Sequence, residues 1–450
     1  MRPRHVKGDG TRAIRLNDLL FTTVVLVLGV LALTTTSSRF SADERPFIWL
    51  SFLAHVGAAF AMIVVVRDVF EGGDMLAYHL VGNTIADQLR AAPADTIGLL
   101  FDLLVQKAEP IPIPGALPGS STGSMQALSA ILSLLFNGSL FGATLFVTLA
   151  AFFGKLSIFS ILRRELPAQS ARSIAVPCLL LPSVVFWSSG ILKEPFAIIG
   201  MGALMGGAYA LANGDFGLRS IVLSAFGLVL VSLVKPHILP PLVAAAAAWS
   251  VVRRQQASGK GRATTRALLV GGALAVVVVL AIGVFFQRFA PDQLAEEVAH
   301  MQEVGAQTSG GSQYTLIANP NASLGTQFAL IPLALLTALF RPAFFEARTL
   351  LVGLNALEVT ALTWLFVVAA LRLRVFGIVP RIAASPALTF CALFVVGFGV
   401  GVGLTTTNLG TLSRYRMPLV PFFGVLLTAL GHQRQDETAA VRPRAGESPA

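Results

Sequence analysis

Long apolar runs separated by short polar stretches dominate the hydropathy pattern of this chain. Runs of this length allow a helix to cross about 30 Å of hydrocarbon, where the backbone must satisfy its own hydrogen bonds. We therefore predict eleven crossing helices, at 19–36, 47–66, 139–160, 173–189, 191–211, 220–234, 238–252, 267–287, 354–371, 386–406 and 416–431. Two shorter runs, at 126–136 and 327–340, are predicted to be re-entrant or interfacial helices.

The composition supports this fold class. Hydrophobic residues make up 55% of the chain and charged residues 12%, and the mean hydropathy is +0.75. These values are typical of a chain that lipid solvates. We predict an all-α fold, a polytopic transmembrane helical bundle with amphipathic surface helices in its loops. The expected organisation is a basic cytoplasmic tail (1–18), a single transmembrane domain (19–431) with large loops at 67–125 and 288–326, and a flexible C-terminal tail (432–450).

The net charge of +10 suggests nucleic acid in a soluble protein, but here the basic residues gather at the ends of apolar runs. The positive-inside rule explains this arrangement, so we expect no nucleic-acid partner. The residues that mark cytoplasmic loops are Arg163, Arg164, Arg172, Arg253, Arg254, Lys260, Arg262, Arg266, Arg372, Arg374 and Arg381. Threading the chain from these anchors places 67–125, the turns near 190 and 236, 288–326 and 407–415 on the outer face.

The N-terminal tail conflicts with this threading. Its basic residues, Arg2, Arg4, Lys7, Arg12 and Arg15, favour the cytoplasm, and two crossings would then return the chain there before Asp74. The loop 67–125 holds seven acidic residues against three basic ones, which argues against a cytoplasmic loop. We favour the outer face for it.

The first loop contains Gly-Gly-Asp-Met-Leu-Ala-Tyr-His at 72–79, with a carboxylate, a phenol and an imidazole close together. Asp74 is the candidate catalytic residue, and Tyr78 and His79 are candidate binding residues. Apolar residues follow at helical spacing, at Leu76, Leu80, Val81, Ile85 and Leu89, and predict an amphipathic helix on the membrane. A second such helix is expected near 96–106. A simple helix N-cap is the alternative role for Asp74.

Further candidates lie at other outer corners. They are Lys193 and Glu194 before Pro195, Lys235 and His237 around Pro236, Tyr314 after two glycines, Arg341 with Glu346, and Arg414, Tyr415 and Arg416 before the last crossing. Charges at the edge of hydrocarbon are costly and therefore functional candidates. Guanidiniums can hold a phosphate by paired hydrogen bonds. The alternatives are snorkelling lysines, a capping Glu194, an idle second loop and arginines that bind lipid headgroups.

In this order, the Gly-Gly-Asp segment, the Ser-Ser-Gly-x-x-Lys-Glu-Pro turn at 188–195 and the Arg-Tyr-Arg-Met-Pro segment at 414–418 resemble bacterial multi-spanning glycosyltransferases of the GT-C class. They also resemble the related exopolysaccharide and O-antigen polymerases. The resemblance implies a bacterial inner-membrane enzyme whose extracytoplasmic face transfers a sugar from a polyprenyl-phosphate donor to a glycan or lipid acceptor. This chain departs from the common pattern because two crossings precede a single Asp74.

In that class an acidic residue of the first large loop is the catalytic base, a position that Asp74 matches. The basic corners would then hold the lipid phosphate, and other envelope polysaccharide enzymes are expected partners. The sequence shows no metal cluster or cofactor motif, and it leaves a divalent cation open. The rival interpretation is a flippase or transporter of a lipid-linked glycan or anionic solute, with His55 and Glu358 as polar groups inside crossings. A third is a non-catalytic scaffold of an envelope complex.

Overall fold

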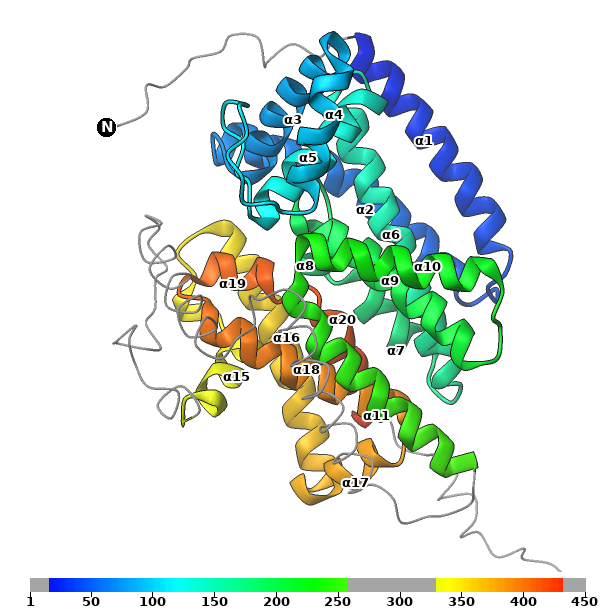
Figure 1. The fold of residues 1–450 in the computed structure, drawn as a ribbon. Coiled ribbons are helices and arrows are strands. Elements are labelled where there is room, and N and C mark those ends of the chain that lie inside the picture. Colours follow the sequence, from blue (N-terminus) through cyan, green and yellow to red (C-terminus); the bar gives the residue numbers. More distant parts are fainter. Residues whose placement is uncertain (1–15, 258–328, 432–450) are drawn as a thin grey trace, which may run out of the picture.

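A computed structural model describes residues 16–257 and 329–431, which form helices and no sheet (Figure 1). Six helices in this part of the chain are long and apolar enough to cross a membrane, which indicates a membrane protein. They are α1 (Leu16–Ser37), α2 with its π-helical end η2 (Arg45–Val69), α6 (Leu140–Glu165), α9 (Lys193–Ala212), α16 (Leu350–Leu373) and α18 (Pro386–Thr405). A seventh is added if α10 (Leu218–Val234) and α11 (Leu239–Ala257) count as one bent span.

Shorter elements connect these helices. Before α9 they are α3 (Asp74–Ala91), α4 (Pro93–Leu104), α5 (Ser121–Leu135), α7 (Ala171–Ala175), the π-helical turn η3 (Val176–Leu180) and α8 (Pro182–Trp187). After α10 they are η4 (Pro236–Ile238), α15 (Ile331–Phe340), η5 (Phe344–Glu346), η6 (Val375–Gly377), α17 (Ile378–Ala383), α19 (Leu409–Tyr415) and α20 (Val420–Gly431).

The prediction of eleven crossings is therefore met only in part. Six predicted crossings coincide with the six long helices, and the predicted short helices at 126–136 and 327–340 correspond to α5 and α15. The predicted crossing at 416–431 contains only α20, a helix of 12 residues. The predicted crossing at 267–287, the second loop and the C-terminal tail lie outside the described residues.

The predicted crossing at 173–189 is a broken helix. Leu181 has an extended backbone between η3 and α8, and Pro182 begins α8. The carboxylate of Glu358, on α16, accepts hydrogen bonds from the backbone N–H and the hydroxyl of Ser183. A buried helix start needs such partners because its first N–H groups have none within the helix. Glu358, expected as a polar group inside a crossing, thus fixes the start of α8.

The long helices define two ends of the molecule. Helices α6 and α9 run side by side in the same direction, because Gly154 meets Gly202 and Glu165 meets Tyr209. The broken helix α7–α8 returns the chain between them. Helix α10 runs back along α9, with Gly227 against Gly200, and the chain then bends by 120° into α11. The turns at 188–192 and 235–237 therefore share one end. Lys193 contacts α5 there, and α5 packs on α3, so we call it the α3 end.

The opposite end, which we call the Glu165 end, is basic. Arg253 lies 3.8 Å from Glu165, Gln256 donates a hydrogen bond to the carbonyl of Ala384, and Arg163 pairs with Glu44. These contacts gather the loop after α1, the ends of α6 and α11, and the turn after α17. The anchors Arg163, Arg164, Arg253, Arg254 and Arg381 thus belong to one end.

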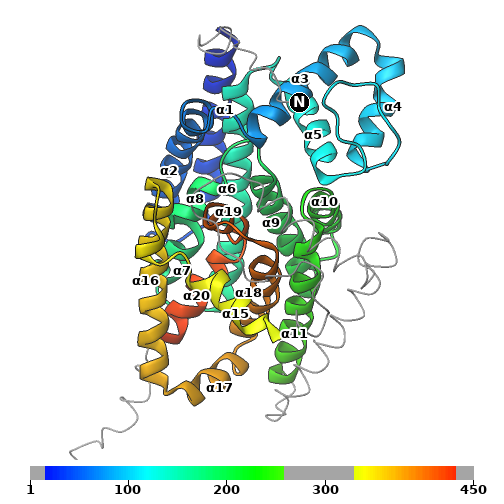
Figure 2. The same cartoon turned by 90° about the vertical axis from the view of Figure 1, so that its left-hand side faces the viewer.

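Helices α3, α4 and α5 form a small group at the α3 end (Figures 1 and 2). The predicted amphipathic helices are present as α3 and α4, but α3 packs on protein. It buries Met75, Tyr78, Val81 and Ile85, whereas Leu80 stays 69% exposed. The backbone of Ser129 on α5 approaches Gly82 so closely that a Cβ there would lie 2.7 Å away. This close approach rotates the buried face of α3 away from the predicted one.

Candidate functional site

Asp74 meets Arg414 across 340 residues of sequence, with Nη1 of the arginine 2.8 Å from Oδ2 of the carboxylate. Gly73 precedes the helix at φ 109°, a backbone conformation that glycine adopts readily. Gly73 is therefore the N-cap of α3, and Asp74 is its first residue. The structure thus shows no N-cap role for Asp74. Its side chain, half exposed, is directed to the arginine instead.

Glu194 lies on the other side of the same arginine. Its two carboxylate oxygens are each 2.9 Å from a cation, one from Nε of Arg414 and one from Nζ of Lys235. Glu194 is fully buried and Lys235 is 4% exposed. A capping Glu194 and a snorkelling Lys235 were the simpler alternatives. Both are wrong, because the two side chains turn inward and pair.

Lys193 completes the group. Its ammonium donates to the hydroxyls of Ser121 (2.8 Å) and Thr122 (3.1 Å), at the start of α5, rather than snorkelling outward. The five charged residues, which we call the ion cluster, are Asp74, Lys193, Glu194, Lys235 and Arg414. Three positive charges against two negative ones leave the cluster with one surplus positive charge. A site with this balance attracts an anion.

Two tyrosines line the ion cluster. The Tyr415 ring lies under the ammonium of Lys235, with 4.6 Å between Nζ and the ring centroid. Burial raises the pKa of the Tyr78 phenol, and the carboxylate of Asp74 raises it further. Burial also raises the pKa of Tyr415. Both phenols therefore stay protonated at neutral pH and can act as hydrogen-bond donors or walls rather than as bases.

Arg414 stays charged. Burial acts to lower the pKa of its guanidinium, but the carboxylates of Glu194 and Asp74 outweigh burial and hold that pKa above its ordinary value. Asn408 caps the start of α19 by accepting a hydrogen bond from the N–H of Gly410. This short helix places Arg414 and Tyr415 on its last turn, against the start of α9. His237, two residues after Lys235, stacks on Phe398 with 5.9 Å between ring centroids.

Other predicted site residues lie apart from these ion pairs. Arg341 pairs with Glu346 within its own loop. Arg416 is 2% exposed, and its guanidinium donates to the carbonyls of Ala338 and Arg341 and to Asn355. It therefore joins α15, α16 and the end of α19. His79 contacts Asn83 one turn along α3, and Tyr314 lies outside the described residues.

Three polar residues of interest escaped the sequence interpretation. Ser121 and Thr122 hold Lys193, and the only signal was a run of small polar residues at 119–124. Lys155 lies inside a predicted crossing, and a lysine within an apolar run is the signal that could have identified it. It is 1% exposed and contacts Nε2 of His55 and the hydroxyl of Ser188.

The arrangement can bind an anion and accept a proton. Lys193 and Arg414 are the residues that could hold a phosphate, and the half-exposed carboxylate of Asp74 could take a proton from a hydroxyl beside it. Within residues 16–257 and 329–431, no group of three or more His, Cys, Asp or Glu side chains is placed to hold a metal ion.

Comparison with known proteins gives no relative for this chain. No family model, no curated protein and no solved structure matches it. The function must therefore be argued from the site itself.

Proposed function

We propose that this protein is a membrane glycosyltransferase of the polytopic GT-C kind. It transfers a sugar from a polyprenyl-phosphate donor to a hydroxyl of a glycan or lipid acceptor. The observation that carries the proposal is the Asp74–Arg414–Glu194–Lys235 chain of ion pairs. It unites the segments on which the resemblance rests, and it sets an exposed carboxylate beside surplus positive charge at one end of an apolar bundle.

We propose a mechanism that uses these ion pairs. The donor phosphate competes with Asp74 for Arg414 and draws on the surplus charge of Lys193, because phosphate forms strong paired hydrogen bonds with guanidinium. Asp74, released from the pair, takes the proton of the acceptor hydroxyl. The acceptor oxygen forms a bond to the anomeric carbon while the bond from that carbon to the phosphate oxygen breaks. The leaving polyprenyl phosphate keeps the electron pair, and the cations stabilise its charge.

Buried Glu194 has a different part. It holds Arg414 and Lys235 in place, so that the cations meet the phosphate with little reorganisation. Arg416 and Arg341 do not bind the phosphate in this proposal. The guanidinium of Arg416 is held by backbone carbonyls, and that of Arg341 is paired with Glu346.

The proposal includes a setting. The chain would lie in a bacterial inner membrane with eleven crossings, and the α3 end would face the extracytoplasmic side. The basic Glu165 end supports this orientation, because cytoplasmic loops are rich in arginine and lysine. Membrane lipids and other envelope polysaccharide enzymes would be its partners, and a divalent cation is not required to balance a lipid monophosphate.

The test is the Asp74→Asn variant, assayed with a radiolabelled polyprenyl-phosphate sugar in membranes that contain the full chain. We expect sugar transfer to fall at least 100-fold because the general base is lost, a contribution of about 10²–10⁴ in rate. Donor binding should persist, since the cations remain. Asp87→Asn is the matched control, because Asp87 lies on the exposed face of the same helix and pairs with Arg90. Normal transfer by Asp74→Asn would refute the proposal.

A second candidate is transport of a lipid-linked anionic substrate. The broken helix at Leu181–Pro182 and the bend at Lys235 favour it, because interrupted helices with ionisable residues are typical of transporter sites. The two functions separate in proteoliposomes that hold the labelled lipid. A transporter moves the label between leaflets without forming a new glycosidic bond, whereas the enzyme forms the bond and requires Asp74.

A further inference from the structure

A pocket of about 210 Å³ lies between α6, α9, α11 and the start of α18. It occupies the Glu165 end, whereas the ion cluster lies at the α3 end. Glu194 and Tyr209 are both on α9 and separated by 15 residues, which at 1.5 Å per residue is roughly 22 Å. The pocket is therefore distinct from the candidate active site.

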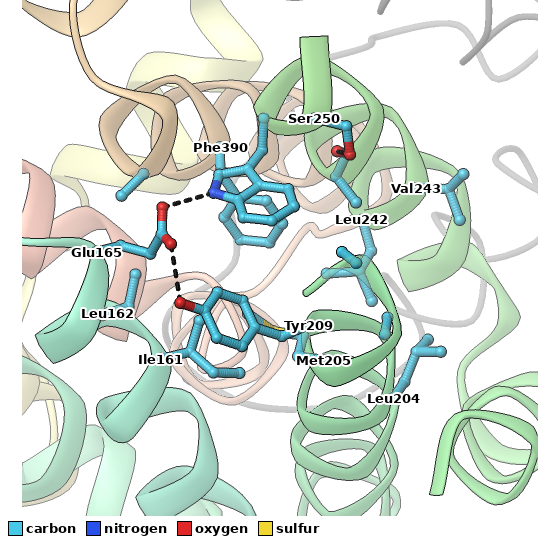
Figure 3. Close-up of a pocket in the computed structure, with 15 residues that line it drawn as sticks. Ile161, Leu162, Glu165, Leu204, Met205, Tyr209, Leu242, Val243, Ser250 and Phe390 are labelled. Atoms are coloured by element: carbon cyan, nitrogen blue, oxygen red, sulfur yellow. Dashed lines mark hydrogen bonds between the residues drawn. The ribbon is translucent and has the colours of Figure 1, made fainter. Parts of the chain in front are cut away.

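The walls of this pocket are apolar. Leu162, Leu204, Met205, Leu242 and Phe390 line it (Figure 3). Alanines at 208, 212 and 246 leave the space that larger side chains would fill. A cavity with such walls suits a hydrocarbon chain, which makes no hydrogen bonds and gains free energy on leaving water.

The polar groups at one edge already bond to each other. Figure 3 shows the Tyr209 phenol directed at the Glu165 carboxylate, to which it donates a hydrogen bond of 2.9 Å. The indole N–H of Trp249 donates to the other oxygen at 2.9 Å. The tyrosine and tryptophan rings pack with 5.8 Å between centroids. Such rings are typical of the level where hydrocarbon meets headgroups.

Positive charge surrounds this edge. The Arg253 guanidinium lies 4.9 Å from the Trp249 ring centroid and 5.8 Å from that of Tyr209, and the side chain is 38% exposed. Arg164 is exposed on the last turn of α6. These two arginines against Glu165 leave one surplus positive charge. Guanidinium binds phosphate well, so the rim complements an anionic headgroup.

We propose that this pocket binds one acyl chain of an anionic phospholipid, with Arg253 against the lipid phosphate. The apolar walls take the chain, the aromatic pair lies at the headgroup level, and the arginines supply the opposite charge. The inference is independent of the proposed enzyme activity.

The experiment uses phosphatidylglycerol with a photoreactive group on one acyl chain, added to the full-length protein in phosphatidylcholine nanodiscs. After irradiation, labelled peptides are mapped by mass spectrometry. We expect label on α9 and α11 beside the pocket. Unlabelled phosphatidylglycerol should displace the probe at least fivefold more effectively than phosphatidylcholine does. Ala208→Trp, which fills the pocket from an exposed position, should reduce this label at least fivefold. Arg253→Gln should remove the preference for phosphatidylglycerol over phosphatidylcholine.

Two matched variants serve as controls. Ala32→Trp places the same bulk on the exposed face of α1, and Arg219→Gln removes an exposed arginine at the start of α10. Neither should change the label on α9 and α11. Label that survives Ala208→Trp unchanged would overturn the proposal. So would the absence of label from α9 and α11, as expected if residues 258–328 of the chain occupy the pocket instead.

Discussion

Glu194 is the residue on which the charges of the ion cluster depend. Its carboxylate, fully buried, contacts Arg414 and Lys235 at the same distance of 2.9 Å. Among the residues that the structure describes, Lys235 has an aromatic face beside it but pairs with no carboxylate other than Glu194, whereas Arg414 also reaches Asp74. Loss of the Glu194 charge would therefore affect Lys235 most.

We predict that Glu194→Gln destabilises the protein by about 3–5 kcal/mol, because it leaves buried cations uncompensated. Thermal unfolding in detergent would measure the effect. Glu109→Gln, on the exposed loop after α4, is the control and should leave the melting temperature unchanged. In the double variant Glu194→Gln with Lys235→Gln, much of the lost stability should return, since neighbouring charges couple. If Glu194→Gln alone is as stable as wild type, the Glu194 carboxylate does not hold the ion cluster together.

Lys155 is a further buried lysine, and its amine is held by neutral groups. Nζ donates to the carbonyl of Val184 (3.1 Å) and the hydroxyl of Ser188 (2.5 Å), and it contacts Nε2 of His55. Nδ1 of His55 faces the carbonyl of Ser51 at 2.6 Å, which assigns the ring proton to Nδ1 and leaves Nε2 as the acceptor. Lys155 thus ties α2 and α6 to the turn that leads to Lys193 and Glu194.

Replacing this lysine should be costly even by a residue of similar shape. We predict that Lys155→Met lowers stability by about 1–3 kcal/mol, because Nε2 of His55 and the carbonyl of Val184 lose a buried partner. The melting temperature in detergent tests this. Lys107→Met is the control, because Lys107 is half exposed and pairs with Asp102 at the surface, and its loss should not be measurable. Equal melting temperatures for Lys155→Met and wild type would contradict the assigned contacts.

At the scale of elements, glycines set how closely the apolar helices approach. A Cβ on Gly202 of α9 would lie 2.3 Å from the carbonyl oxygen of Gly154 on α6. On Gly227 of α10 it would lie 2.3 Å from the backbone N of Leu204 on α9. Lipid provides little hydrophobic drive between helices, so close backbone packing through small residues stabilises their association.

We predict that Gly202→Ala destabilises the bundle by about 1–3 kcal/mol through overpacking. Gly57→Ala is the matched control, because Gly57 lies within α2 with no atom within 4 Å of an added Cβ. There the alanine should be neutral or stabilising, since alanine favours a helix interior over glycine. Both variants are compared by thermal unfolding in the same detergent. Equal effects at the two positions would argue against the α6–α9 contact.

Much of the helical organisation could be predicted from the sequence. Hydropathy located six long helices to within a few residues, because length and apolarity are local properties of a run. The interruption at Leu181–Pro182 was missed, since a proline in an apolar run indicates either a kink or a helix start. The buried face of α3 was also missed, because the approach of Ser129 to Gly82 depends on a partner helix rather than on spacing.

At the scale of the molecule, the two ends differ in charge and in chemistry. Parity of crossings predicted that the turns near 190, 236 and 414 share a face with Asp74, and the ion pairs place all four together. The pairing itself was beyond a single sequence, because contacts over 340 residues depend on how every intervening helix packs. Arg416, two residues from Arg414, could not be distinguished from it by composition.

The beginning of α1 also belongs to the α3 end, because Ser139, at the start of α6, donates a 2.7 Å hydrogen bond to Asp18. Helix α1, which follows the basic residues 1–15 in the sequence, therefore begins at the same end as Asp74, while the arginines in the last turns of α6 and α11 lie at the other. The two orientation signals conflict in three dimensions as they do in the sequence. More arginines lie at the Glu165 end than in the N-terminal tail, and this is why the proposed orientation places the Glu165 end in the cytoplasm.

Cysteine accessibility tests this assignment. In intact cells, we predict that Asp87→Cys reacts with a membrane-impermeant maleimide, whereas Arg254→Cys reacts only after the membrane is opened. Both residues are exposed at opposite ends, and the native Cys178 and Cys391 are buried, which keeps the background low. Leu16→Cys should behave like Asp87→Cys, because α1 begins at the α3 end. Inverted labelling would place the ion cluster in the cytoplasm and rule out an extracytoplasmic lipid-linked donor, while labelling of Asp87→Cys and Arg254→Cys from one side would contradict the arrangement of the helices.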